Sequence, residues 1–93
     1  MNHYLLIYYV VNDYVALRAP YRDEHLKLVW DGHSRGELVM AGALADPVDR
    51  AVLVFRVPDP QPIEEFVHND PYVKNGLITE WKVRQWNLVI GSD

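Results

Sequence analysis

The segment "YLLIYYVV", residues Tyr4–Val11, sets the architecture of this chain. Leucine, aromatic and β-branched residues fill it, and these residue types favour β-strands. The run ends at Asn12 and Asp13, which together form a turn signal. It is far shorter than the roughly 20 apolar residues that span a bilayer, and it lacks a basic flank. We therefore interpret it as a buried strand and expect no membrane association.

The pattern of apolar residues predicts the elements that follow this strand. In residues 18–36, apolar side chains and a glycine recur on one stripe of a helix. Residues 37–43 and 50–57 have the composition of strands, and the Asp-Pro step between them predicts a hairpin. A short helix over 63–69, a turn or helical piece over 70–76 and a final strand over 79–90 complete the chain. The order β-α-β-β-α-β predicts an α+β, ferredoxin-like fold, in which two helices cover one face of a four-stranded antiparallel sheet.

The strands carry apolar side chains on both faces, although two helices can cover only one of them. In the first strand Leu5 and Ile7 point to one side, while Leu6 and Tyr8 point to the other. An antiparallel sheet with one wet face alternates apolar and polar residues instead. We therefore expect a homodimer in which a second copy covers the open sheet face. In the last strand the apolar register shifts near Gln85, which predicts a bulge or a strand that leaves its own sheet to meet a partner.

Length and composition limit the classes of function. The chain has 93 residues, enough for one domain, 1–93, and too few for separate cofactor and substrate domains. Its net charge is -4 and its nine Lys and Arg residues are scattered singly, which argues against nucleic-acid binding. The chain has no cysteine, which excludes disulfides, thiolate metal sites and a cysteine nucleophile. This composition fits a reducing compartment, so we expect a cytoplasmic protein, and we predict neither a metal site nor another cofactor.

Two residues are candidates for acid/base chemistry. His25 lies on the inward stripe of the first helix, where an apolar side chain is expected, and a buried imidazole needs a hydrogen-bond partner. Asp70 precedes Pro71, which is typical of a helix N-cap. His25 could simply donate to a backbone carbonyl, and Asp70 could act only as a cap. The two residues could also work together, because one carboxylate oxygen can cap a helix while the other orients the imidazole for proton transfer. The remaining histidines are expected to be structural or solvated: His3, His33 and His68.

Four further residues could contact a ligand beside this pair. Arg22 precedes His25 by three residues, so it lies near it on the helix and could hold a carboxylate or phenolate, or it could lie in solvent. Tyr21 and Tyr72 could line a pocket with their hydroxyl groups inward, although packing in the core explains either residue. Gly42, inside a strand, marks a bulge or a place where a ligand approaches the backbone.

Taken together, the segments "YRDEHLKLV", "MAGAL", "NDPYVKNGL" and "EWKVRQW" resemble the YciI-like family, also called the YCII-related domain. Their order and spacing hold from the first strand to Trp86. The resemblance implies a ferredoxin-like fold of the dimeric α/β-barrel type, with an active site built from a His and an Asp that fall here on His25 and Asp70. It implies no single reaction, because similar barrels include muconolactone isomerases, small monooxygenases and haem-binding proteins. Asp23 stands where the family often has proline, and the connection "ADPVD" is short and acidic. The resemblance therefore does not determine the shape of the pocket.

These observations lead to two hypotheses about function. The first is a cofactor-independent isomerase or lyase that acts on a small aromatic-derived or lactone-like molecule. In it His25 shuttles a proton, Asp70 orients the ring, and Arg22 and Tyr72 position the substrate. The alternative is a dimeric protein that binds a small ligand, or supports a partner enzyme, without turnover. Haem binding through a histidine is a third and less favoured hypothesis.

Overall fold

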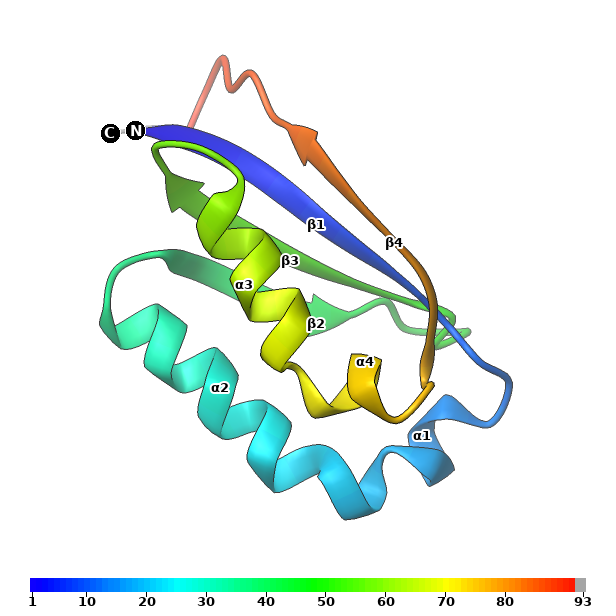
Figure 1. The fold of residues 1–93 in the computed structure, drawn as a ribbon. Coiled ribbons are helices and arrows are strands. Elements are labelled where there is room, and N and C mark those ends of the chain that lie inside the picture. Colours follow the sequence, from blue (N-terminus) through cyan, green and yellow to red (C-terminus); the bar gives the residue numbers. More distant parts are fainter. Residues whose placement is uncertain (92–93) are drawn as a thin grey trace.

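The computed structural model describes residues 1–91 and shows helices gathered on one side of a four-stranded antiparallel sheet (Figure 1). The elements are β1 (Asn2–Val10), α1 (Tyr14–Leu17), η1 (Ala19–Tyr21), α2 (Arg22–Ser34), β2 (Leu38–Ala43), β3 (Arg50–Val57), α3 (Gln61–Asn69), α4 (Pro71–Lys74) and β4 (Ile78–Gln85). The predicted order β-α-β-β-α-β is confirmed, with α1 and η1 as short additions, and α4 lies within the turn or helical piece predicted over 70–76. None of the helices within residues 1–91 is long and apolar enough to cross a membrane.

Strand β1 lies in the interior of the sheet, whose strand order is β2-β3-β1-β4. Its register with β3 runs from the pair Asn2 and Val57 to the pair Tyr9 and Arg50, and β4 pairs with its other edge. Residues directly opposite one another in antiparallel strands project to the same side. This register therefore sorts the side chains into a helix-covered face and an open face.

The core lies between the sheet and the helices. On β1 the side chains of Tyr4, Leu6 and Tyr8 are buried in it. Phe55 of β3 meets Phe66 of α3 edge to face, with ring centroids 5.5 Å apart. Fully burying one such large side chain contributes about 1.5–3 kcal/mol, so this face holds the domain together.

Helix α2 follows the 3-10 turn η1, which contains Pro20, so it begins later than the predicted span. Two acidic residues occupy its first turn and His33 its last, which suits the helix dipole. Near its end Gly32 lies against β2, because a Cβ at that position would be 3.4 Å from the Cβ of Leu38. This close approach anchors the end of α2 and holds its N-terminal half beside the far end of β2.

The predicted final strand is too long. It ends at Gln85 instead of residue 90, and no bulge forms there; the register of the β1–β4 pair shifts between Tyr9 and Val10. The backbone N–H of Trp86 still donates to the carbonyl of His3 at 2.8 Å, and the paired part of the β1–β4 ladder ends next to it, at Tyr4 and Gln85. A strand needs a neighbouring strand for its backbone hydrogen bonds, so the residues after Gln85 do not join the sheet. The side chain of Val89, for example, is 98% exposed.

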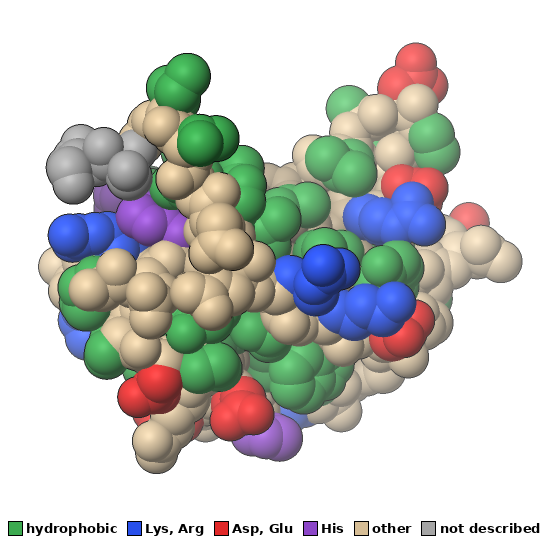
Figure 2. Space-filling view, turned by 90° about the horizontal axis from the view of Figure 1, so that it is seen from above, with side chains coloured by type: hydrophobic (Ala, Val, Ile, Leu, Met, Phe, Trp, Pro, Cys, Tyr) green, Lys and Arg blue, Asp and Glu red, His purple; other side chains and the backbone are tan. Residues whose placement is uncertain are grey.

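The open face of the sheet combines apolar and cationic side chains. Leu5 and Ile7 of β1 are partly exposed on it, and they lie opposite Arg84 and Lys82 of β4. Figure 2, which looks down on the molecule from the sheet side, shows hydrophobic and cationic side chains next to one another. The apolar open face predicted for β1 is therefore present, and the charges on β4 flank it.

Candidate active site

Asp70 occupies the sharp connection between two helices. It follows the last residue of α3 and precedes Pro71, with extended backbone angles of φ -75 and ψ 119. Its carboxylate caps α4, because Oδ1 accepts a hydrogen bond of 3.0 Å from the backbone N–H of Tyr72. The predicted N-cap is thus confirmed, and the Asp-Pro step fixes where the carboxylate emerges.

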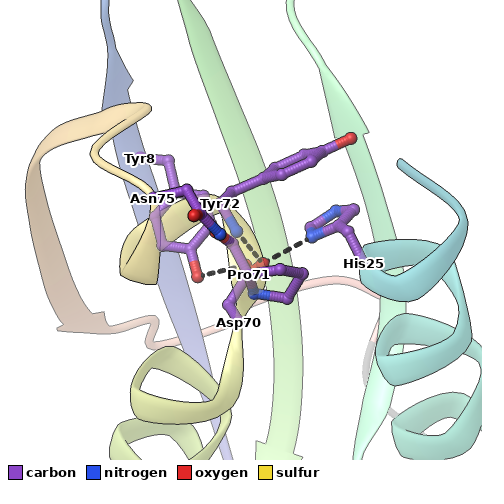
Figure 3. A network of polar contacts seen from close by, with 6 residues as sticks. All are labelled: Tyr8, His25, Asp70, Pro71, Tyr72 and Asn75. Atoms are coloured by element: carbon purple, nitrogen blue, oxygen red, sulfur yellow. Dashed lines mark hydrogen bonds and ion pairs between the residues drawn. The ribbon is translucent and has the colours of Figure 1, made fainter. Parts of the chain in front are cut away.

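The Asp70 carboxylate is 0% exposed and is the one buried charged group among the described residues. Besides the Tyr72 amide, it contacts two side chains that are distant in sequence (Figure 3). The Tyr8 hydroxyl donates to Oδ2 at 2.7 Å, and Nδ1 of His25 lies 2.8 Å from Oδ1. A buried charge is costly unless it is hydrogen-bonded, and these three contacts replace the hydrogen bonds to water that the carboxylate loses on burial.

The contact with Asp70 fixes the proton on the imidazole of His25. Because Oδ1 already accepts the amide N–H of Tyr72, it is an acceptor for Nδ1 as well, so Nδ1 carries the proton and donates. The neutral ring then has its lone pair on Nε2. Tyr72 stacks on the ring, with centroids 3.8 Å apart and planes 9° apart, which prevents it from rotating freely. His25 is therefore held in one orientation by Asp70 and Tyr72, and its side chain is 13% exposed.

A cavity of about 230 Å³ opens in front of this ring, between the N-terminal half of α2 and the sheet. Its apolar walls include Leu26 and Leu53, and its polar lining comes from Tyr8, Tyr14, Arg18, Arg22, His25 and Tyr72. An apolar cavity of about 150 Å³ takes up benzene, so this volume suits one ring with small substituents. Across residues 1–91, no three His, Asp or Glu side chains gather closely enough to hold a metal ion.

The phenols around the cavity keep their protons at neutral pH. Burial raises the pKa of the Tyr8 hydroxyl, and the charge of Asp70 raises it further. Burial also raises the pKa of Tyr72, although the nearby guanidinium groups of Arg22 and Arg18 oppose the shift. Both hydroxyl groups are thus available as hydrogen-bond donors.

The structure brings together most of the residues singled out in the sequence. His25, Arg22, Tyr72 and Gly42 line the cavity, and Asp70 lies directly behind His25. Tyr21 is not part of the lining; it packs against the small cluster around Tyr14 and Leu77.

The sequence analysis did not identify three polar residues that line the cavity. Tyr8 could have been suspected, because the alternation of β1 places it on the helix-covered face and a buried phenol needs a partner. Tyr14 and Arg18 begin and follow α1, a helix of 4 residues that is too short to produce a periodic signal.

Comparisons with known proteins agree with this architecture. The model of the YCII-related domain matches residues 1–87, whereas no curated protein matches the chain. Among solved structures, 5-chloro-2-hydroxyhydroquinone dehydrochlorinase (TftG) from Burkholderia phenoliruptrix AC1100, in complex with 2,5-dihydroxybenzoquinone, has a similar fold. Its TM-score is 0.76 at 17% sequence identity, over 91% of this chain and 93% of that chain. The resemblance seen in the sequence is confirmed by a family match over nearly the whole chain, and the chain therefore belongs to the YCII-related domain family.

Proposed function

We propose that this protein is a small acid/base enzyme of the isomerase or lyase type, which needs no cofactor and uses His25 as its proton-transfer group. The observation that carries the proposal is the 2.8 Å contact between Nδ1 of His25 and the buried Asp70, with the same ring lining a cavity. A base held by a carboxylate at one nitrogen and facing a cavity is the arrangement that general acid/base catalysis requires.

In the proposed step, Nε2 of His25 removes a proton from a C–H or O–H bond of the substrate. In a lyase reaction, the electron pair of that bond forms a new double bond, a leaving group departs with its own bonding pair, and the imidazolium gives its proton to the leaving group or to water. In an isomerisation, the imidazolium returns the proton to another atom of the same molecule. Asp70 stabilises the imidazolium formed between the two transfers, and Tyr8 holds the second oxygen of Asp70 in place.

A small aromatic-derived or lactone-like molecule fits the proposed site best. The cavity volume of about 230 Å³ admits one substituted ring, and Arg22 and Tyr72 line it as positioning residues. Gly42 adds a stretch of strand backbone without a side chain. The similarly folded dehydrochlorinase is named for a substituted hydroquinone, which supports a ring compound with a leaving group as the first substrate class to test. Tyr21 lies outside the lining, so it is not among the proposed contacts.

A homodimer in the cytoplasm is part of the same proposal. Leu5 and Ile7 on the open face would be covered by the same face of a second copy, while Lys82 and Arg84 would lie toward the edge of the contact. The lack of cysteine supports a reducing compartment. We expect sedimentation equilibrium to give the mass of two chains at micromolar concentration and Ile7→Asp to reduce it to one. A single-chain mass for the wild type would contradict the dimer.

The hydrogen bond between His25 and Asp70 can be tested by NMR before any substrate is known. A hydrogen bond to a charged acceptor is shorter and stronger than one to a neutral acceptor. We expect the Nδ1–H proton of His25 to resonate far downfield, and to move upfield or vanish in Asp70→Asn. The Nδ1 of His33, which contacts the carbonyl of Leu38 at 2.8 Å, is the control within the same spectrum and should not change. An unchanged His25 signal would show that Asp70 is only a cap.

Turnover is tested with a panel of chlorinated hydroxyhydroquinones and five-membered lactones, by following chloride release and ultraviolet absorbance. We expect His25→Gln and Asp70→Asn to lower kcat by about a hundredfold or more, and His33→Gln to leave it unchanged. If ligands from the panel raise Tm equally in wild type and His25→Gln, and no turnover is found, the protein is a ligand-binding module instead.

A further inference from the structure

A second polar group lies at the cavity and is not used by the proton-transfer residues. Arg18 and Arg22 both line the cavity, together with the phenols of Tyr14 and Tyr72. Tyr14 begins α1, Arg18 lies between α1 and η1, and Arg22 begins α2, and all three residues line the cavity. The chain thus presents two guanidinium groups to the same space.

Neither guanidinium group is neutralised by the protein. Within residues 1–91, neither Arg18 nor Arg22 forms an ion pair, whereas Arg35 near the other end of α2 pairs with Glu37 at 3.0 Å. Arg18 lies over the ring of Tyr14, 5.1 Å from its centroid, which holds the group in place without removing its charge. Two uncompensated cations therefore line the cavity of a protein whose net charge is -4.

The hydroxyl of Tyr72 also forms no hydrogen bond within residues 1–91, although the guanidinium of Arg22 lies near enough to oppose the rise of its pKa that burial causes. Its residue is 1% exposed, and its oxygen is the one buried side-chain polar atom among the described residues that has no hydrogen bond. Figure 3 shows this oxygen at the end of the phenol that points away from Asp70, beyond the His25 ring. Leaving a buried hydroxyl without a partner is costly, so such an atom at a cavity favours a ligand that hydrogen-bonds to it.

We propose that Arg18, Arg22 and the Tyr72 hydroxyl form an anion subsite, so that the ligand of this cavity is a small ring compound bearing a carboxylate or an ionised ring hydroxyl. Guanidinium groups bind such oxygens through charge-assisted hydrogen bonds, and the phenol adds a neutral donor. The inference rests on the proposed function, because it names the substrate class of the same cavity. It assigns Arg18 as a specificity-determining residue. The exposed carboxylates of Asp23 and Glu24 on the same turn of α2 are not part of the lining.

The test compares ligands that differ in charge and little in shape. Benzoate and benzamide are titrated into the full chain and followed by ¹H–¹⁵N chemical-shift perturbation at neutral pH, which measures weak binding. The dianion of 2,5-dihydroxybenzoquinone is a third probe, and it distinguishes an ionised ring hydroxyl from a carboxylate. We expect each anion that fits to bind roughly tenfold tighter than benzamide, and its binding to weaken as salt is raised.

The variants separate the subsite from general effects. Arg18→Gln and Arg22→Gln should each weaken anion binding by roughly tenfold and leave benzamide binding within about twofold, and Tyr72→Phe should weaken the anion by about fivefold. Arg35→Gln is the matched control, and it should change neither ligand. Equal binding of benzoate, the quinone and benzamide, no binding of any of them, or an unchanged anion affinity in Arg18→Gln would overturn the subsite.

His25→Gln separates a failure of the subsite from a failure of the proposed function. If the anions bind with the same dependence on Arg18 in this variant, and no substrate is turned over by the wild type, the subsite stands and the enzyme function fails. If turnover depends on His25 but charge has no effect on affinity, the enzyme stands and the subsite fails.

Discussion

Helix α2 carries two histidines, His25 near its start and His33 near its end, and each forms one hydrogen bond of 2.8 Å through Nδ1. His25 bonds to a fully buried carboxylate and stacks on Tyr72. His33 bonds to the backbone carbonyl of Leu38, and its ring contacts the exposed ring of Trp30 edge to face. The two sites share a residue type, a helix and a hydrogen-bond length, yet only His25 lines a cavity.

The difference lies in what surrounds each ring. A buried carboxylate attracts a charged imidazole strongly, whereas the carbonyl of Leu38 carries no charge and attracts it less. The arginines near the two histidines also differ. Arg22, near His25, lines the cavity and forms no ion pair within residues 1–91, whereas Arg35, near His33, is paired with Glu37. Residue type alone therefore does not set the environment of a histidine; burial and the charge of its partner do.

The largest effect is expected from Asp70→Ala, which removes the feature that distinguishes the two histidines. It leaves the Tyr8 hydroxyl, the Tyr72 amide and Nδ1 of His25 without their acceptor. We expect the free energy of unfolding, measured in urea, to fall by about 3 kcal/mol.

Asp31→Ala is the control on the exposed side of α2, where the carboxylate is 54% exposed, and it should stay within about 0.5 kcal/mol. A loss below about 1 kcal/mol for Asp70→Ala would mean that water replaces the carboxylate without difficulty.

The next largest effect is expected from Tyr8→Phe, which removes one of the three donors to Asp70. We expect a loss of about 1.5 kcal/mol in urea denaturation at neutral pH, because Oδ2 becomes a buried acceptor without a partner. Tyr4→Phe is the matched control on the same face of β1, since its hydroxyl makes no hydrogen bond to another residue within 1–91, and it should change stability much less. Equal losses in the two variants would assign the effect to packing alone.

High pH should lower the free energy of unfolding, because two buried phenols line the cavity. Burial raises the pKa of Tyr8 and of Tyr72, so the folded state retains phenolic protons that the unfolded chain releases above about pH 10. The unfolded state then binds fewer protons, and stability is lost as pH rises, by up to about 1.4 kcal/mol per pH unit and phenol. Tyr8→Phe should show a flatter decline in urea denaturation between pH 9 and 11. Parallel curves for the variant and the wild type would contradict this account.

The smallest effects are expected from the two arginines. Arg22→Gln and Arg35→Gln should each change the free energy of unfolding by less than about 0.5 kcal/mol, because both groups are exposed and surface ion pairs contribute little. The two variants should differ only in ligand binding, as argued above for the anion subsite. A large loss of stability in Arg22→Gln would show that this residue supports the fold instead of the ligand.

The sequence predicted elements whose pattern is local and long enough to read. β1 was evident from its composition, and α2 from one apolar stripe that also placed His25 on the inner side. Asp70 was identifiable as a cap because the Asp-Pro step is a local signal. The final strand was predicted too long, because apolar spacing does not reveal which residues pair with a neighbouring strand.

The candidate site was predictable only in part. The pairing of His25 with Asp70 was one of two open interpretations until the structure placed Nδ1 and Oδ1 at 2.8 Å. The contact between Tyr8 and Asp70 joins residues 62 positions apart, and no local pattern encodes it. Arg18 lies in a turn between short helices, where spacing gives no information about which side a side chain takes.

The order of residues along the chain was enough to indicate the fold class, the two-faced strands and the two residues of the proposed acid/base pair, because backbone preference and side-chain alternation act over a few neighbours. The choice among partners was made by packing. Only the folded chain brings β1, α2 and the α3–α4 connection to one point, where a buried carboxylate must take the donors that the packed elements supply. His25, Arg18 and Arg22 line the same cavity for that reason.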